Sequence, residues 1–230
     1  DMPMNVPEGF KLAAITERED PRDAFVSNQY TSLQELPEGS IVGTSSLRRE
    51  SQLRAQFPHL KVQPLRGNVQ TRLRKLDEGQ YAAIILAAAG LKRLGLSDRI
   101  TALLDPEQSL PAVGQGALGI ECRADRDDLV QLLQPLHHME TAYCVEAERS
   151  MSRVLGGSCQ VPLGAFAEII DGTLQLRGFV AQPDGTRIVS DALNGKPETG
   201  IKMGQELAEK LIKQGADEIL ASLVPAEGWK

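Results

Sequence analysis

Cysteine is scarce in this sequence: its 230 residues include 3, at positions 122, 144 and 159. Such wide spacing argues against a disulfide framework and fits a reducing cytoplasm. No cluster of cysteine and histidine has the spacing of a zinc site, so no metal is expected. Long apolar runs are also missing, since no stretch reaches the roughly 18 residues that span a bilayer. We therefore expect a cytoplasmic protein with no membrane partner.

The first residues, DMPMNVPEGF, have neither the basic region nor the apolar core of a signal peptide. They begin with Asp1 rather than with an initiator methionine. The 41% hydrophobic and 24% charged residues are ordinary for a soluble globular protein.

Positive charge is low overall but concentrated in one segment. The net charge is −6, yet residues 41–100 hold 11 Lys and Arg against 4 acids, so this segment carries +7 and the remainder −13. Eight of those cations are arginine, whose planar fork matches carboxylate or phosphate better than the lysine ammonium does. The segment predicts a local anionic ligand, although any single arginine could instead lie on a solvated helix face.

Aromatic residues are few in the basic segment, where only Phe57 and Tyr81 occur. Bases of a nucleic acid would find few surfaces on which to stack. The cations also cluster at expected helix starts rather than along one ribbon, so no nucleic-acid partner is expected. A receptor-like anion-binding module remains open as an alternative.

Strands and helices alternate through the basic segment. Strands are expected at 41–43, 61–65 and 81–89, and a helix follows each of them. This alternation predicts an α/β domain with a parallel sheet. Ligands of such sheets bind beyond the carboxyl ends of the strands, where helix N-termini attract anions.

Polar clusters follow each of these strands: Thr44-Ser45-Ser46, Arg66-Gly67-Asn68, and the stretch from Gly90 to Arg93. Ser46 and Asn68 are typical helix N-caps. Arg48 and Arg49 fall in the first turn of a helix, where the helix dipole disfavours cations. We expect an anion to lie between these two arginines.

The pattern changes near residue 140. A helix is expected at 141–154, then strands at 163–170, 174–181 and 187–193, then a helix at 203–214. Asp-Gly pairs separate the strands and predict hairpins. The sequence predicts a C-terminal α+β domain with a three-stranded antiparallel sheet.

Cys159 differs from the other cysteines in its surroundings. It follows Gly156-Gly157 and precedes Pro162, so it lies in a pliable loop with room for a bulky attachment. Cys122 and Cys144 fall in an expected strand and helix and are expected to be structural. A reactive thiol needs access and thiolate character, and nearby arginines could favour the thiolate. A packed structural thiol is the alternative for Cys159.

Five long stretches resemble the porphobilinogen deaminase family, also called hydroxymethylbilane synthase, of bacterial type. They extend over essentially the whole chain and are EREDPRDAFVS (17–27), GSIVGTSSLRRESQL (39–53), LRGNVQTRLRKLDEGQYAAIILAAAGLKRLGL (65–96), LPAVGQGALGIECR (110–123) and GGSCQVPLGAFAE (156–168).

The resemblance implies a monomeric transferase of porphyrin and haem biosynthesis. It would link four porphobilinogen units, with loss of ammonia, into the linear tetrapyrrole hydroxymethylbilane. A dipyrromethane cofactor held by a thioether to Cys159 would prime the chain. Asp1 would be catalytic, its carboxylate stabilising positive charge on pyrrole nitrogens. Each porphobilinogen carries an acetate and a propionate, which suit bidentate arginine pairs.

The same resemblance assigns the binding residues. Those that bind the cofactor would be Cys159, Thr44, Ser45, Ser46, Arg48, Arg49 and Asn68. Those that bind the substrate would be Arg66, Arg72, Arg93 and Gln115.

The resemblance also implies a periplasmic-binding-protein-like arrangement of domains. Residues 1–17 would be a remnant of domain 1, 18–111 domain 2, 112–135 the return segment of domain 1, and 136–230 domain 3. The family has roughly 80 further residues, most of a domain, before Asp1. We expect a truncated chain that cannot run the reaction alone, because the cleft lacks a wall.

Overall fold

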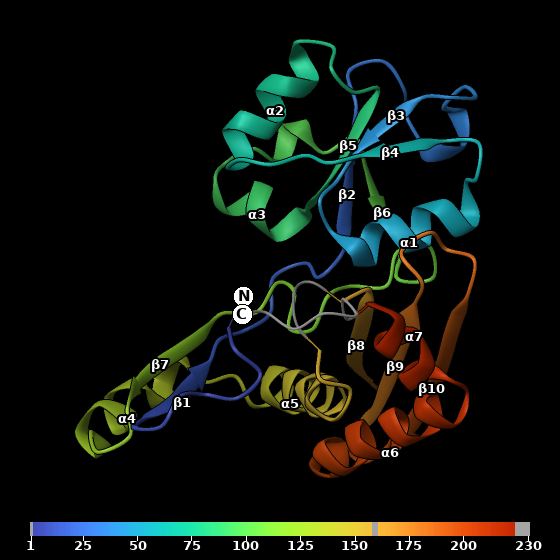
Figure 1. The fold of residues 1–230 in the computed structure, drawn as a ribbon. Coiled ribbons are helices and arrows are strands. Elements are labelled where there is room, and N and C mark those ends of the chain that lie inside the picture. The colour runs from blue at the N-terminus through green and yellow to red at the C-terminus, as the bar shows by residue number, and fades with distance from the viewer. Residues whose placement is uncertain (1, 158–160, 224–230) are drawn as a thin grey trace, which may run out of the picture.

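The computed structural model describes residues 2–157 and 161–223. Figure 1 shows three parts: a domain around a five-stranded sheet, a C-terminal domain around a three-stranded sheet, and a projecting two-stranded sheet. The expected α/β and α+β domains are thereby confirmed.

The five-stranded sheet has the strand order β4-β3-β5-β2-β6. Its strands are β2 (Asp23–Val26), β3 (Ile41–Gly43), β4 (Lys61–Gln63), β5 (Ala83–Ala87) and β6 (Ala102–Leu104). β3 runs parallel to both β4 and β5, as expected, whereas β2 runs antiparallel to both β5 and β6. The reversed β2 makes the sheet mixed and brings its first residue to the carboxyl end of β5.

Helices cover both faces of this sheet (Figure 1). They are α1 (Leu47–Gln56), α2 (Val69–Asp77) and α3 (Ala88–Arg93). β5 is buried on both sides: Ile84 and Leu86 belong to the core under α2 and α3, and Ile85 belongs to the core under α1. A strand buried on both faces explains the continuous apolar run in the sequence.

The C-terminal domain packs helices on one face of an antiparallel sheet of order β10-β9-β8. Its elements are α5 (Met139–Val154), β8 (Leu163–Ile170), β9 (Thr173–Ala181), β10 (Ile188–Gly195), α6 (Gly200–Lys213) and α7 (Ala216–Leu223). Met151, Leu176 and Leu207 are fully buried between helices and sheet. Burying each such side chain contributes about 2 kcal/mol of hydrophobic free energy.

The projecting sheet joins two segments far apart in the chain. β1 (Phe10–Ile15) pairs antiparallel with β7 (Gly119–Arg123), and α4 (Asp127–Leu133) packs against β1. Short 3-10 helices complete the described elements: η1 (Leu33–Glu35), η2 (Ser97–Arg99), η3 (Gln134–Leu136) and η4 (Pro197–Thr199). None of the described helices has the length and hydropathy needed to cross a membrane.

Two crossing segments, 16–22 and 105–118, connect the projecting sheet to the five-stranded sheet, and α5 binds both. Glu148 of α5 is fully buried. Its Oε1 accepts from Arg18 Nη1 at 2.6 Å and from the Ala167 amide at 2.8 Å. Its Oε2 accepts from Arg18 Nη2 at 3.1 Å and from the Gly114 amide at 2.6 Å. One carboxylate thus fixes both crossings to the C-terminal domain.

Candidate functional site

The turn after β3 forms the expected helix cap. Ser46 is the N-cap of α1, and its side chain accepts from the Arg49 amide at 3.4 Å. Thr44 is buried, and its Oγ1 accepts from the Ser46 amide at 3.1 Å. The exposed Ser45 bonds through Oγ to both the amide and the carbonyl of Leu65, each at 2.9 Å. The three hydroxyls therefore shape the carboxyl ends of β3 and β4.

An anion does lie between Arg48 and Arg49, but it is a carboxylate of the chain itself. Arg48 donates from Nη1 and Nη2 to the two oxygens of Asp23 at 2.8 and 3.1 Å. Arg49 donates to Asp23 Oδ1 from Nε at 3.0 Å, and its Nη2 lies 2.8 Å from the same oxygen. Burial disfavours the charged carboxylate, but the charges and hydrogen bonds of both arginines outweigh it and hold the pKa of Asp23 well below its usual range.

Gln115 joins the second crossing segment, 105–118, called the return crossing below, to this cluster. Its Nε2 donates to the Pro21 carbonyl at 2.6 Å and to Asp23 Oδ1 at 3.0 Å, and Arg48 Nη2 donates to its Oε1 at 3.4 Å. Half-buried in this way, Gln115 lies at the same edge of the sheet as the arginines.

The loop after β4 brings further cations to this edge. Asn68 caps α2 by accepting from the Thr71 amide at 2.8 Å, and Arg72 Nε donates to the Gly67 carbonyl at 2.8 Å. Burial and then the positive charge of Arg49 lower the pKa of Arg72. Arg49 and Arg72 are therefore close enough to repel each other, and an anionic ligand near both would relieve that repulsion.

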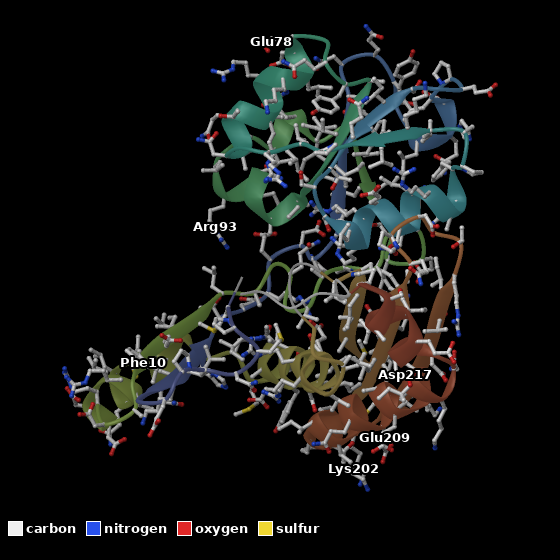
Figure 2. All side chains as sticks on the ribbon, viewed as in Figure 1. Phe10, Glu78, Arg93, Lys202, Glu209 and Asp217 are labelled. Atoms are coloured by element: carbon white, nitrogen blue, oxygen red, sulfur yellow. The ribbon has the colours of Figure 1, made fainter. Side chains whose placement is uncertain are left out.

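Arg66 and Arg93 are exposed. Figure 2 shows Arg93 at the end of α3, on the side of the five-stranded-sheet domain that faces the rest of the chain. Within residues 2–157 and 161–223, Arg66, Arg72 and Arg93 form no ion pair. Other cations of the basic segment do form ion pairs: Arg54 with Glu50, Arg74 with Glu78, Lys92 with Glu19 and Asp20, and Arg99 with Asp77.

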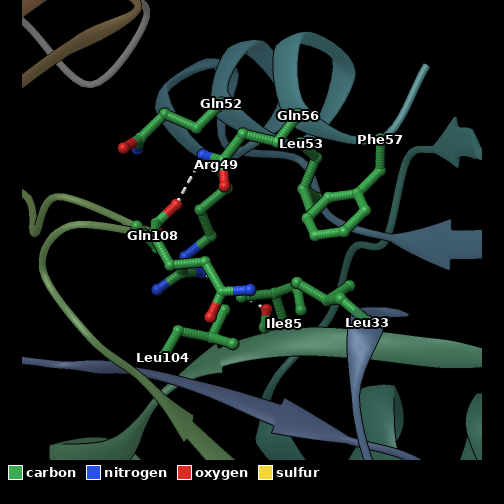
Figure 3. Close-up of a pocket in the computed structure, with 10 residues that line it drawn as sticks. Leu33, Arg49, Gln52, Leu53, Gln56, Phe57, Ile85, Leu104 and Gln108 are labelled. Atoms are coloured by element: carbon green, nitrogen blue, oxygen red, sulfur yellow. Dashed lines mark hydrogen bonds between the residues drawn. The ribbon is translucent and has the colours of Figure 1, made fainter. Parts of the chain in front are cut away.

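A small cavity adjoins Arg49 between α1 and the sheet. Figure 3 shows the Arg49 side chain running from α1 toward Ile85, whose carbonyl accepts from Arg49 Nη1 at 3.4 Å. The cavity has a volume of about 10 Å³ and is lined mainly by apolar side chains such as Leu53 and Leu104. Since this space holds a single water at most, any larger ligand could reach Arg49 only from outside the cavity.

A larger cavity of about 320 Å³ lies between the crossing at 18–21, the start of α5 and β8. Its lining includes Glu19, Asp20, Glu140 and Glu168, against one cation, Arg18, which is bonded to Glu148. This acidic lining is unsuited to a ligand that carries many carboxylates.

The two cysteines that the structure describes lie in a helix and a strand, as expected. Cys144 is buried in α5, where burial and the nearby Glu148 raise the pKa of its thiol to about 12, so it stays protonated. Cys122 is half-buried in β7. Cys159 and Asp1 lie outside the described residues, so their predicted roles stay predictions. No group of three or more possible metal ligands occurs in the part of the chain that the structure describes.

Two family models together match most of the chain. The one described as "Porphobilinogen deaminase, dipyromethane cofactor binding domain" matches residues 1–131. The one described as "Porphobilinogen deaminase, C-terminal domain" matches residues 142–213. The chain belongs to the porphobilinogen deaminase family. This confirms the predicted enzyme family and its dipyrromethane cofactor domain, and nothing in the comparisons favours the receptor alternative.

Curated relatives of the same family cover nearly all of the chain. The porphobilinogen deaminase of Nitrosomonas europaea is 73% identical over 223 residues, which are 97% of this chain and 72% of that protein. Those of Methylobacillus flagellatus and Chromobacterium violaceum are 66% and 62% identical, over 97% of this chain and 72% of each protein. A solved lipoprotein of the YaeC family from Enterococcus faecalis is 18% identical over 61% of this chain and 68% of that chain, with a TM-score of 0.39.

The residues at the carboxyl edge fit the acidic pyrroles of this family, which are the cofactor and the substrate. An acidic dipyrrole needs cationic forks and N–H donors, and Arg49, Arg66, Arg72 and Arg93 offer guanidinium groups there. Three of these four have no carboxylate partner within the described ranges. The donor set therefore matches a polycarboxylate ligand better than it matches a neutral one.

Proposed function

We propose that this chain binds the dipyrromethane cofactor, the growing pyrrole chain and porphobilinogen along the carboxyl edge of the five-stranded sheet. The observation that supports this most directly is the set of arginines without ion pairs in the described ranges, Arg66, Arg72 and Arg93, of which Arg72 lies close to Arg49. In this proposal Arg48, Arg49, Asn68 and the hydroxyls of Thr44, Ser45 and Ser46 hold the cofactor. Arg66, Arg72, Arg93 and Gln115 hold the substrate.

The dipyrromethane group supplies the pyrrole carbon to which porphobilinogen is joined as ammonia leaves. The chain's own residues orient the partners of that reaction. Arginine forks would bind the acetate and propionate groups and hold adjacent rings in register, so that the reacting carbons meet at one place. Cys159 would hold the cofactor as a thioether. The Asp1 carboxylate would stabilise the positive charge that develops on the pyrrole nitrogens.

The domain boundaries at 17, 111 and 135 are part of the same proposal. The pairing of β1 with β7 and the crossings at 16–22 and 105–118 support them. A monomer in the cytoplasm, without a nucleic-acid or membrane partner, is also proposed.

Intact mass tests the proposed attachment. Chain purified from cells that make porphobilinogen is expected to carry an increment of two linked pyrrole units. Cys159→Ser is expected to lack the increment, because its oxygen cannot form the thioether, whereas Cys122→Ser is expected to keep it. A wild-type chain of unmodified mass, or an increment that persists in Cys159→Ser, would refute the attachment.

Porphobilinogen affinity tests the arginine edge through two variants of one helix. Arg72→Gln is expected to weaken binding about tenfold or more in calorimetric titration, since a charge-assisted hydrogen bond contributes about 1.5–3 kcal/mol. Arg74→Gln removes the same charge from α2, but its guanidinium is paired with Glu78. This control is expected to change the affinity less than twofold. If both variants lost the same affinity, net charge alone would explain the effect and the specific role of Arg72 would be refuted.

A further inference from the structure

Asp23 occupies an unusual place for a carboxylate, at the centre of a predicted anion-binding edge. It is the first residue of β2 and is fully buried. Because β2 is reversed, Asp23 lies opposite Ala87, the last residue of β5, and opposite Leu104, the last residue of β6. It therefore sits at the carboxyl edge, where α1 begins.

The bonds of Asp23 converge from separate elements. Besides Arg48 and Arg49 of α1, its Oδ2 accepts from Ser109 Oγ at 2.7 Å and its Oδ1 accepts from Gln115 Nε2 at 3.0 Å. Arg48 also donates to the Leu110 carbonyl at 2.6 Å. The carboxylate thus fixes α1 to the return crossing.

The two arginines differ in how much of the guanidinium group remains accessible to a ligand. The Arg48 side chain is 4% exposed and bonds through both Nη atoms to Asp23, Leu110 and Gln115. The Arg49 side chain is 11% exposed and is held along its Nε–Nη2 edge by Asp23. Two guanidinium groups and one carboxylate leave the cluster with a net positive charge. Arg49 is the more exposed of the two arginines and lies close to Arg72, so it presents this charge to a ligand.

We propose that Asp23 is a positioning residue for the acidic ligand: it orients the Arg49 guanidinium toward the ligand and holds Arg48 as its inner support. The inference rests on the proposed function, because the ligand is the acidic pyrrole assigned there. Asp23 itself repels that ligand, so its contribution is geometric. A bidentate contact needs a guanidinium of fixed orientation, and the Asp23 bonds supply that orientation.

The proposal and simple electrostatics predict opposite changes in porphobilinogen affinity for Asp23→Asn. Asp23→Asn removes a negative charge beside an anion site, which by charge alone would tighten porphobilinogen binding. If Asp23 positions Arg49, the folded fraction of Asp23→Asn instead binds porphobilinogen at least tenfold more weakly. Asp105→Asn removes an exposed charge from the crossing segment 105–118, which contacts Asp23, and is expected to leave the affinity within twofold. Unchanged or tighter binding by Asp23→Asn overturns the proposal.

A second readout needs no ligand and separates this proposal from the proposed function. The Arg49 Nε–Hε signal in a ¹H–¹⁵N NMR spectrum, assigned by its loss in Arg49→Lys, is expected to exchange slowly in the wild type. It is expected to exchange fast in Asp23→Asn and to recover in part in Asp23→Glu. A signal unaffected by Asp23→Asn overturns the positioning role. If the wild type shows no porphobilinogen binding, the proposed function fails and this signal still decides the role of Asp23.

A milder variant tests the same role in case Asp23→Asn does not fold. Ser109→Ala deletes one donor to Asp23 Oδ2 and leaves the charges in place. It is expected to speed Arg49 Nε–Hε exchange by severalfold in a folded chain. If neither Ser109→Ala nor Asp23→Asn changes that exchange, the role is refuted.

Discussion

Glu148→Gln is expected to destabilise the chain by about 3–5 kcal/mol, the usual cost of leaving one partner of a buried ion pair without the other. Arg18 is 11% exposed, and its Nη1 and Nη2 both donate to this carboxylate. A glutamine amide keeps one oxygen, but its NH₂ would face N–H donors of Arg18 and the Gly114 amide. Urea unfolding followed by circular dichroism measures the change in unfolding free energy.

Glu140→Gln is the matched control for that variant, since it makes the same substitution at an exposed position in the first turn of α5. Only a favourable contact with the helix dipole is lost there, a few tenths of a kcal/mol. If Glu148→Gln unfolded at the same urea concentration as Glu140→Gln, the buried ion pair would not hold the crossings to the C-terminal domain.

Gly116→Ala is expected to cost about 2–4 kcal/mol, from left-handed backbone strain together with overpacking. Gly116 has φ +89°, and a Cβ there would approach the Glu19 carbonyl oxygen of the other crossing. The two crossings meet at this point, where the Glu19 amide donates to the Gly116 carbonyl at 3.0 Å. Thermal and urea unfolding both measure the loss.

Gly90→Ala provides the contrast within the same chain. Gly90 lies inside α3, and a Cβ built on it meets nothing within 4 Å. Alanine is expected to stabilise that helix by about 0.5–1 kcal/mol. A Gly116→Ala chain as stable as the wild type would show that the crossings can separate at little cost.

The elements that carry a local signal are predictable from the sequence, and those that depend on tertiary contacts are not. The apolar run before residue 89, the cap at Asn68 and the Asp-Gly hairpins each carry a local signal, and each forms as expected. β2 and β6 have 4 and 3 residues, and no α-helix follows directly after either strand. β3 and β4 are equally short, but a capped helix follows each of them and reveals it. The pairing of β2 and β6 comes from tertiary contacts, so the sequence predicted three strands of that sheet and missed two.

The candidate site shows the same difference between features with a local signal and features that depend on tertiary contacts. An anion between Arg48 and Arg49 could be inferred because cations are unfavourable at a helix start. That the anion is Asp23 could not be inferred, since it depends on the unrecognised reversed strand. Glu148 was missed for a similar reason: nothing in the α5 sequence distinguishes a carboxylate that gathers N–H groups from three segments. The motif EREDPRDAFVS contained Asp23 and Arg18 without revealing their partners.

The reversed β2 also brings together the two ends of the segment that forms the five-stranded sheet. Chain enters at Asp23 and leaves at Leu104, and these two residues are paired neighbours across β2 and β6. A segment whose ends meet in this way can be excised, circularised or grafted into a host loop with a short linker, because neither end must travel to find the other. The arginines of segment 23–104 would move with it, whereas Ser109 and Gln115, which bond to Asp23, and Leu110, whose carbonyl accepts from Arg48, would be left behind and would have to be supplied by the host.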